Sequence, residues 1–221
     1  MENARLPLFR CFVNFPGAIR TLCLTAGLFL VVGCDDKDVD VLVTQPHDKN
    51  KMMQIMHTMM DHMEEVSMNN DPDVVFANMM IVHHQGAIDM ANEELAHGDF
   101  AELRAIAEKI KADQEKEIQE LKDFLSAYEP DQPMDEKFNM EVMEAMEKAG
   151  QAADLRILTG DTDRDFAELM IPHHQSAIEN ARSVMEHGTS PEIYEMAHKM
   201  VDAQMAEIKQ LQQWLLAHRK Y

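Results

Sequence analysis

A gapless internal repeat limits the folds open to this chain more than any other feature of its sequence. Residues 76–127 align with residues 166–217 at a constant offset of 90, and a phenylalanine, a His-His-Gln triplet and a His-Gly pair recur at matching places. The central box reads MMIVHHQ over 79–85 and LMIPHHQ over 169–175. A match of this length without insertions predicts one supersecondary unit that is used twice.

Each copy of the repeat has the pattern of a helical hairpin. In the first copy, residues 71–73 (DPD) supply an N-cap, a proline at the first helical position and an early acidic residue, so a helix is expected to begin there and to run to His97. Gly98 ends this helix, and a second helix is expected over 100–128. Because the turn between them is short, the two helices are expected to be antiparallel.

Polar residues interrupt the apolar stripes of these helices at matching heights. His84 and Gln114 lie about equally far from the turn, roughly 22 Å along the helix axis at 1.5 Å per residue. Buried polar groups need partners, so these residues are expected to bind each other, water or a metal ion. The expected interior layer holds Met80, His83, His84, Gln114 and Glu117 in the first hairpin, and Met170, His173, His174, Gln204 and Glu207 in the second.

Two such hairpins would bury their stripes against each other, which predicts an all-α protein built as an antiparallel four-helix bundle. No run of alternating β-branched residues occurs after residue 45. A further helix over 135–158 would form a long crossover between the hairpins. The helical domain is expected over 50–219, with repeat one at 50–128 and repeat two at 139–218.

A methionine-rich segment precedes the first hairpin. Residues 50–68 contain seven methionines and two histidines, and several of these side chains share one face of a helix. Packing alone would explain a flexible apolar face, but a face used only for packing normally holds leucine and isoleucine. Thioether and imidazole groups together suit copper, and sulfur favours Cu(I) over Cu(II). The candidate ligands in this helix are Met52, Met53, Met56, His57, Met59, Met60 and Met63.

The first 33 residues have the pattern of a secretory signal. Three arginines precede an apolar run that is too short to span a bilayer comfortably. The run ends VVGC, which resembles a bacterial lipoprotein processing box with Cys34 as the lipidated residue. Residues 34–49 are then expected to form a flexible acidic tether. The other two cysteines lie in the leader, so any site for a soft metal must use methionine and histidine.

Net charge and motifs exclude several classes of function. The formal charge of -20 argues against nucleic-acid binding and favours attraction of cations. No nucleophile–base pair, phosphate-binding loop or redox cysteine motif is evident, so the protein is expected not to be an enzyme.

The duplicated Met-Ile-x-His-His-Gln box with its downstream Gln-x-x-Glu-Ile resembles the bacterial family catalogued as domain of unknown function 305. The resemblance covers about residues 50–218 and implies a ferritin-like helical fold. The methionine-rich helix and the leader are similar to those of CopM-type members, which are periplasmic copper-binding proteins treated as metallochaperones. The resemblance implies metal-ligand roles for His83, His84, His173 and His174, and for Met79, Met80 and Met170; the sequence adds Met90.

Three functions remain open from the sequence. The first is an exported copper-binding protein for handover or sequestration, held at the membrane by Cys34 or soluble in the periplasm, with a periplasmic copper exporter or oxidase as partner. Its Gln114, Glu117, Gln204 and Glu207 would support the ligands. The second is a structural or partner-binding envelope lipoprotein, in which the polar layer is only a hydrogen-bonded network. The third is a ferritin-like iron protein, for which the chain offers Glu94-x-x-His97 and Glu195-x-x-His198 at non-equivalent places in the repeat.

Overall fold

The computed structural model describes residues 43–219, which lie within one compact unit, Asp40–Tyr221. The predicted signal segment, Cys34 and the first part of the predicted tether lie outside the described residues. Within 43–219 there is no strand, and no helix is long and apolar enough to cross a membrane. The elements are the 3-10 helix η1 (His47–Lys49) and the α-helices α1 (Lys51–Glu64), α2 (Pro72–His97), α3 (Ala101–Ala127), α4 (Glu136–Asp154), α5 (Thr162–His187) and α6 (Pro191–Ala217).

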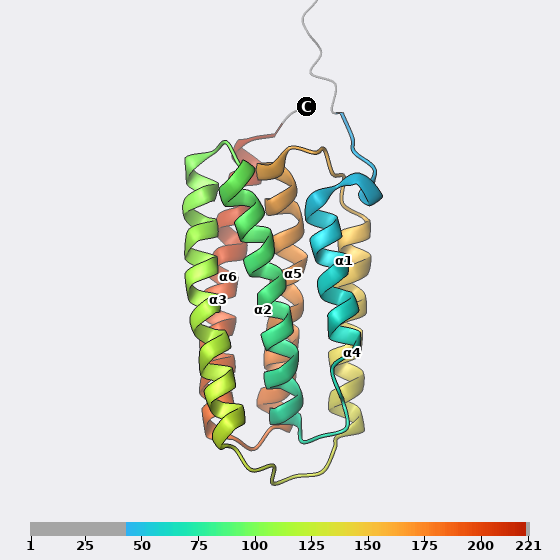
Figure 1. The fold of residues 1–221 in the computed structure, drawn as a ribbon, viewed down its shortest axis with the longest axis vertical. Helices are drawn as coiled ribbons and strands as arrows, with labels where there is room; N and C mark the ends of the chain where they lie inside the picture. Colours follow the sequence, from blue (N-terminus) through green and yellow to red (C-terminus); the bar gives the residue numbers. More distant parts are fainter. Residues whose placement is uncertain (1–42, 220–221) are drawn as a thin grey trace, which may run out of the picture. The chain divides into compact units, whose positions relative to one another are not determined.

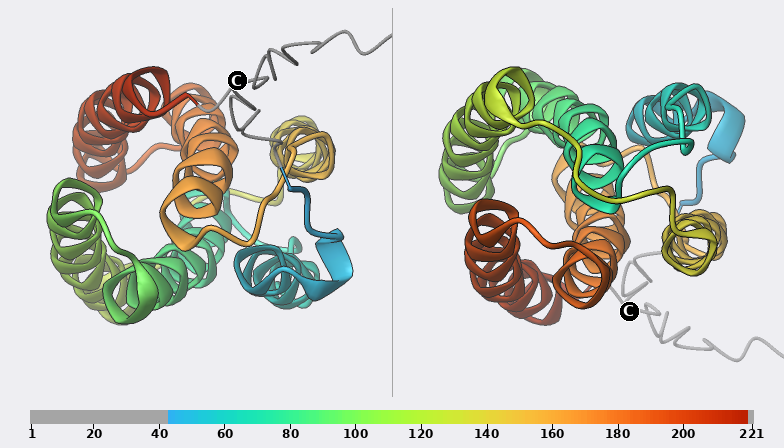
Figure 2. Two further views of the ribbon diagram at one scale, coloured as in Figure 1. Left: turned by 90° about the horizontal axis from the view of Figure 1, so that it is seen from above. Right: turned by 90° about the horizontal axis from the view of Figure 1, so that it is seen from below.

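The two hairpins, α2–α3 and α5–α6, form an antiparallel four-helix bundle, as the repeat predicts (Figure 1). The all-α, ferritin-like fold with a methionine-rich helix and a helical crossover is thereby confirmed. Viewed along the helices, α1 and α4 lie outside this bundle, against the side formed by α2 and α5 (Figure 2). The helices α2 and α5 therefore have neighbours on two sides, which explains why their buried residues are not confined to one stripe.

Each hairpin turn is held by an aspartate from the other repeat. Asp163, in the first turn of α5, accepts hydrogen bonds from the backbone N–H groups of Asp99 (2.8 Å) and Phe100 (2.9 Å). Asp73, at the matching place in α2, accepts from those of Thr189 (2.8 Å) and Ser190 (3.0 Å), which are the counterparts of Asp99 and Phe100 in the second repeat. These N–H groups begin α3 and α6 and would otherwise lack partners, so the crosswise contacts fix both turns and the antiparallel pairing of α2 with α5.

The residues before α1 are tied to the α4–α5 loop. The backbone N–H of Gln45 donates to the Leu158 carbonyl at 2.7 Å, and His47 Nε2 lies 2.9 Å from the Arg156 carbonyl oxygen. Asn50 caps α1 by accepting from the Met53 N–H, and its side-chain amide donates to Asp165 at 2.6 Å. The end of the segment expected to be a tether, 45–49, is thus attached to the helical domain.

A buried acid next to the first turn has no counterpart in the second repeat. Glu94 is fully buried, whereas the matching residue is Val184. Burial, followed by the negative charge of Asp163, raises the pKa of Glu94 to about 8. Because the pKa of the folded state lies above the ordinary value, folding binds a proton on Glu94 between the two values. Its stabilising contribution is complete below the ordinary pKa and is lost as the pH rises through 8.

Replacing Glu94 with glutamine should therefore flatten the pH dependence of stability. The wild-type free energy of unfolding should fall by about 2 kcal/mol between pH 6 and pH 8, since a difference of one bound proton corresponds to about 1.4 kcal/mol per pH unit and Glu94 is half deprotonated at about pH 8. Urea unfolding at several pH values measures this. Glu108→Gln, at an exposed position of α3, is the matched control and should keep the wild-type slope. An unchanged slope in Glu94→Gln would contradict the assignment.

Candidate metal centre

The four histidines of the repeated box divide into two pairs that face opposite sides of the α2–α5 layer. Successive residues in a helix point about 100° apart, so His83 and His84 cannot face the same neighbour. His84 and His174 point to the bundle interior, where their Nε2 atoms lie 2.9 Å from Glu117 and 3.1 Å from Glu207. His83 lines a cavity toward α1 and α4 instead. The single interior layer expected from the sequence is thus two layers.

The bundle-interior layer consists of histidine–carboxylate pairs and buried amides. Burial acts to raise the pKa of Glu207, but hydrogen bonds from His174 and Lys109 outweigh it and hold this pKa below its ordinary value. Lys109 Nζ reaches Glu207 from α3 at 2.7 Å and so connects the two hairpins. Gln114 and Gln204, at matching positions of the two repeats, are also buried, and their side-chain amides have no protein partner. This layer is polar and oxygen-rich.

His83 and His173 meet in the middle of α2 and α5. Their ring centroids are 3.7 Å apart, and His173 Nε2 lies 3.0 Å from the His83 carbonyl oxygen, to which it must donate. His83 Nε2 lies 3.0 Å from the Ser176 hydroxyl, which already donates its proton to the His173 carbonyl. The hydroxyl can therefore only accept from His83. Both rings carry their proton on Nε2 when neutral.

The second ring nitrogen of His83 and of His173 consequently carries a lone pair that no protein group uses. The Nδ1 atoms of His83 and His173 are buried and have no hydrogen-bond partner. Burial, followed by the charges of the neighbouring histidines, holds the pKa of both rings well below the ordinary value. The rings are neutral at physiological pH, which is the protonation state in which imidazole binds metal ions.

A small cavity lies beside His83 and is lined mainly by methionine. Its volume is about 10 Å³, which is close to the space that one water-sized particle needs. The lining residues are Met56, Met59, Met60 and Met63 from α1, Met146 and Ala149 from α4, and His83 and Ser176. We call this space the thioether cavity. It brings together five methionine side chains and one imidazole, and all six of these groups are uncharged.

Two glycines leave the space that two of these methionines occupy. A Cβ atom at Gly86 would lie 2.6 Å from the Met59 sulfur, and one at Gly150 would lie 2.7 Å from the terminal methyl of Met60. Only a residue without a side chain leaves room for Met59 against α2. In the second repeat Ser176 replaces Gly86, and its hydroxyl binds His83. The site is therefore asymmetric although the scaffold is duplicated.

The other residues proposed from the sequence as ligands do not line the thioether cavity. Most of them are buried in the apolar core, and their roles as ligands stay predictions: Met52, Met53, Met79, Met80, Met90 and Met170. His57 is half-exposed and lies 3.7 Å from Asp154. The sequence interpretation missed Met146 and Ser176. The signal for Met146 was its place as the third methionine at three-residue spacing in α4. The signal for Ser176 was that a polar residue occupies the position that matches Gly86 in the first repeat.

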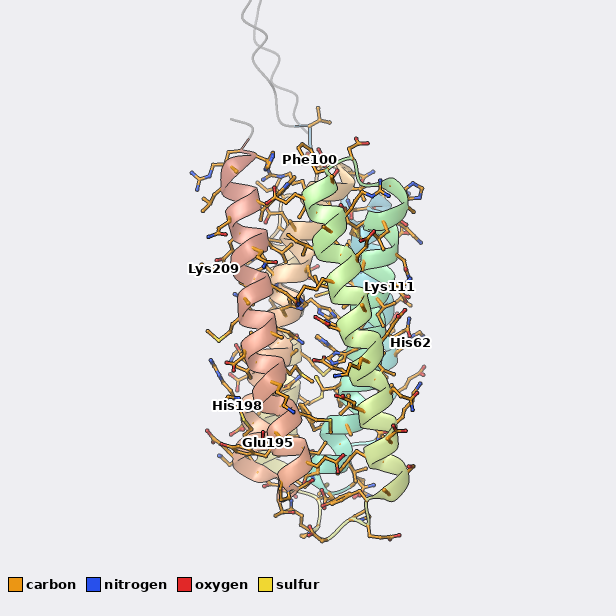
Figure 3. The ribbon with its side chains drawn as sticks, turned by 90° about the vertical axis from the view of Figure 1, so that its left-hand side faces the viewer. His62, Phe100, Lys111, Glu195, His198 and Lys209 are labelled. Atoms are coloured by element: carbon orange, nitrogen blue, oxygen red, sulfur yellow. The ribbon has the colours of Figure 1, made fainter. Side chains whose placement is uncertain are left out.

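The motifs considered for an iron centre are not brought together. Glu195 and His198 lie at the outer surface of α6 (Figure 3), and His97 is exposed, whereas Glu94 is buried beside Asp163. Across residues 43–219, no three His, Cys, Asp or Glu side chains are grouped so that they could hold one metal ion. The sequence already argued against an iron centre, because the two motifs occupy non-equivalent places in the repeat.

Solved structures with copper and silver resemble this fold. CopM in its Ag-bound form is 32% identical, with a TM-score of 0.51 over 66% of this chain and 96% of that one. CopM in its Cu(I)-bound form is 32% identical, with a TM-score of 0.50 and the same coverages. The Cu(II)-bound form of CopM is also 32% identical, with a TM-score of 0.50 over 66% of this chain and 98% of that one. A comparison with curated protein sequences found no match.

The family assignment rests on two overlapping matches. The model of the family described as Domain of unknown function (DUF305) matches residues 35–125 and again residues 73–215, so that together the matches include both hairpins. The resemblance seen in the duplicated histidine box is thereby confirmed. This chain belongs to the DUF305 family.

Proposed function

We propose that this protein binds copper as Cu(I) in the thioether cavity and serves to hand it over or to sequester it. One observation carries the proposal: an ion-sized cavity is walled by five methionines and His83, whose Nδ1 lone pair has no partner. The copper- and silver-bound structures of the CopM relatives support it. In this proposal copper is cargo, and the protein does not act as an enzyme.

The donor set fits a soft monovalent ion. Thioether sulfur is polarisable and uncharged, and it selects Cu(I), whereas Cu(II) favours nitrogen and oxygen donors in a tetragonal arrangement. The bundle-interior layer with His84 and Glu117 offers nitrogen and oxygen, but its histidine Nε2 atoms are already paired with carboxylates. The thioether cavity is therefore the better Cu(I) site. Its candidate ligands are Met56, Met59, Met60, Met63, Met146 and His83.

Neutral ligands suit a protein that must release its cargo. All three cysteines lie at or before position 34, so the thioether cavity contains no thiolate to bind Cu(I) more strongly. Copper bound by thioethers can pass to a partner that offers more donors. A periplasmic copper exporter or oxidase remains the class of partner we propose.

The place of action follows from the leader rather than from the described residues. The apolar run that ends at Gly33 and the following Cys34 support export and attachment to the bacterial envelope on the periplasmic side. The formal charge of -20 supports attraction of cations there. Mass spectrometry of the protein from its membrane fraction, with and without a Cys34→Ser substitution, would test the lipid.

An anaerobic titration against a chromogenic Cu(I) chelator tests the function directly. We expect one tightly bound Cu(I) per chain and a melting temperature that rises with Cu(I), since a ligand that binds only the folded state stabilises it. His83→Leu should weaken Cu(I) binding by about tenfold, which corresponds to about 1.4 kcal/mol. His62→Leu, at an exposed place on α1, is the control and should bind as the wild type does.

The same titration separates a structural role from a copper-binding role. Buried pairs such as His174–Glu207 also favour a purely structural polar network. If the buried histidines had only a structural role, His83→Leu would lower the melting temperature equally with and without Cu(I). Absence of Cu(I) uptake by the wild-type protein would overturn the proposal.

A further inference from the structure

A surface groove between α1 and α4 opens beside the thioether cavity. The two share Met60 and Met146 in their linings. The helices α1 and α4 lie side by side outside the four-helix bundle (Figures 1 and 2). The groove therefore connects the cavity wall to solvent without crossing the bundle.

Methionine side chains continue from the cavity wall to the surface along this groove. Met140, Met143 and Met146 follow one another at three-residue spacing in α4, and all three line the groove. Their exposed fractions fall from 64% to 49% and then to 8%, so the series runs from solvent to the cavity. Exposed methionine in such a series contributes little to packing, which leaves its sulfur as the feature that distinguishes it.

The α1 wall of the groove and the carboxylates around it also suit Cu(I). Met60 is partly buried, lines both spaces and has its terminal methyl facing Gly150, where a side chain would crowd it. Four carboxylates also line the groove, namely Glu64, Glu144, Glu147 and Asp154. They give its mouth a negative potential, which raises the local concentration of cations.

We propose that this groove is the route by which Cu(I) reaches and leaves the thioether cavity, with Met140 and Met143 as transfer ligands and Met60 as the mobile side chain between groove and cavity. This inference rests on the proposed function. Copper stays Cu(I) throughout, because each step forms one copper–sulfur bond as another breaks and no electron or proton is transferred. The transfer ligands speed exchange but do not belong to the final site.

A kinetic experiment on the full-length protein tests the route. Cu(I) is supplied as its complex with a chromogenic chelator, and the rates of loading and of removal by excess chelator are followed by stopped-flow absorbance. In Met140→Leu/Met143→Leu both rates should fall by about tenfold, while the equilibrium affinity stays within about twofold of the wild type. Leucine keeps the apolar volume and removes only the sulfur.

Two further variants sharpen the test. Met134→Leu/Met205→Leu removes two methionines of similar exposure (40% and 51%) that do not line the groove, and its rates should equal those of the wild type. Gly150→Ala should fold at least as stably, since alanine is the better helix former, yet should slow both rates because it crowds Met60.

The outcomes are distinguishable. Wild-type rates in the Met140→Leu/Met143→Leu variant would overturn the route, and so would a loss of equilibrium affinity in proportion to the rates, because these residues would then be ligands of the final site. A wild-type protein that takes up no Cu(I) would overturn the proposed function as well as the route. Binding with unchanged kinetics would overturn the route alone.

Discussion

Replacing the four α1 methionines of the thioether cavity with leucine should abolish tight Cu(I) binding and leave the fold intact. The variant is Met56→Leu/Met59→Leu/Met60→Leu/Met63→Leu, and it leaves only Met146 and His83 of the six candidate donors. Leucine and methionine have similar volumes, so each exchange should cost less than about 1.5 kcal/mol of stability. We expect the affinity for Cu(I) to fall by more than about 100-fold, or about 2.7 kcal/mol, in anaerobic competition.

A matched variant separates loss of sulfur at this cavity from loss of methionine in general. Met52, Met53, Met79 and Met80 are together at least as buried as the four α1 methionines of the cavity and lie outside the cavity wall. Their fourfold replacement by leucine should preserve Cu(I) binding and should change stability by a similar small amount. If this control lost binding while the cavity variant retained it, the ligands would be the broader methionine core that the sequence also allowed.

Removing the Asp163 carboxylate should cause a large loss of stability. Asp163→Ala leaves the N–H groups of Asp99 and Phe100 without their acceptor, at the start of α3. Hydrogen bonds to charged groups contribute about 1.5–3 kcal/mol each, and the two share one acceptor group, so we expect a loss of about 2–4 kcal/mol. Urea unfolding measures it as a lower midpoint at an unchanged slope.

Two comparisons make the assignment specific. Asp163→Asn keeps one oxygen acceptor and should lose about half as much as the alanine variant. Asp61→Ala, at an exposed position in α1, should change stability by less than about 0.5 kcal/mol. Because the charge of Asp163 also raises the pKa of Glu94, Asp163→Ala should weaken the pH dependence that Glu94 produces. An alanine variant as stable as the wild type would show that the crosswise contacts do not hold the turns.

The sequence predicted the helices and their pairing because those depend on local signals. Proline after an N-cap aspartate marks the start of α2, and Gly98 and Gly188 mark the turns, so the predicted and observed bounds of α2 and α3 differ by only a residue. The crossover helix lacks such a stop signal, and α4 ends at Asp154 rather than at the predicted residue 158. The constant repeat offset fixed the pairing of the two halves. Both conclusions need only the spacing of residues along the chain.

The candidate site was harder to predict because it depends on which helix covers which face. Periodicity places His83 and His84 about 100° apart but does not say what lies opposite each of them. The sequence placed His84 and Glu117 in one layer, where they do meet, but only the positions of α1 and α4 outside the bundle show that His83 meets methionine instead. Met146 joins the cavity for the same reason, from a helix that the sequence interpretation treated as a connection.

The exchanged aspartates also bear on how a chain like this could arise. A single hairpin would not contain the acceptor for its own turn, because Asp73 and Asp163 each serve the opposite half. Two separate copies of one hairpin could supply it to each other through identical contacts, which describes a symmetric dimer. Joining the copies in one polypeptide would then allow the halves to diverge, as Gly86 and Ser176 have: one position leaves room for Met59, and the other supplies a hydroxyl to His83.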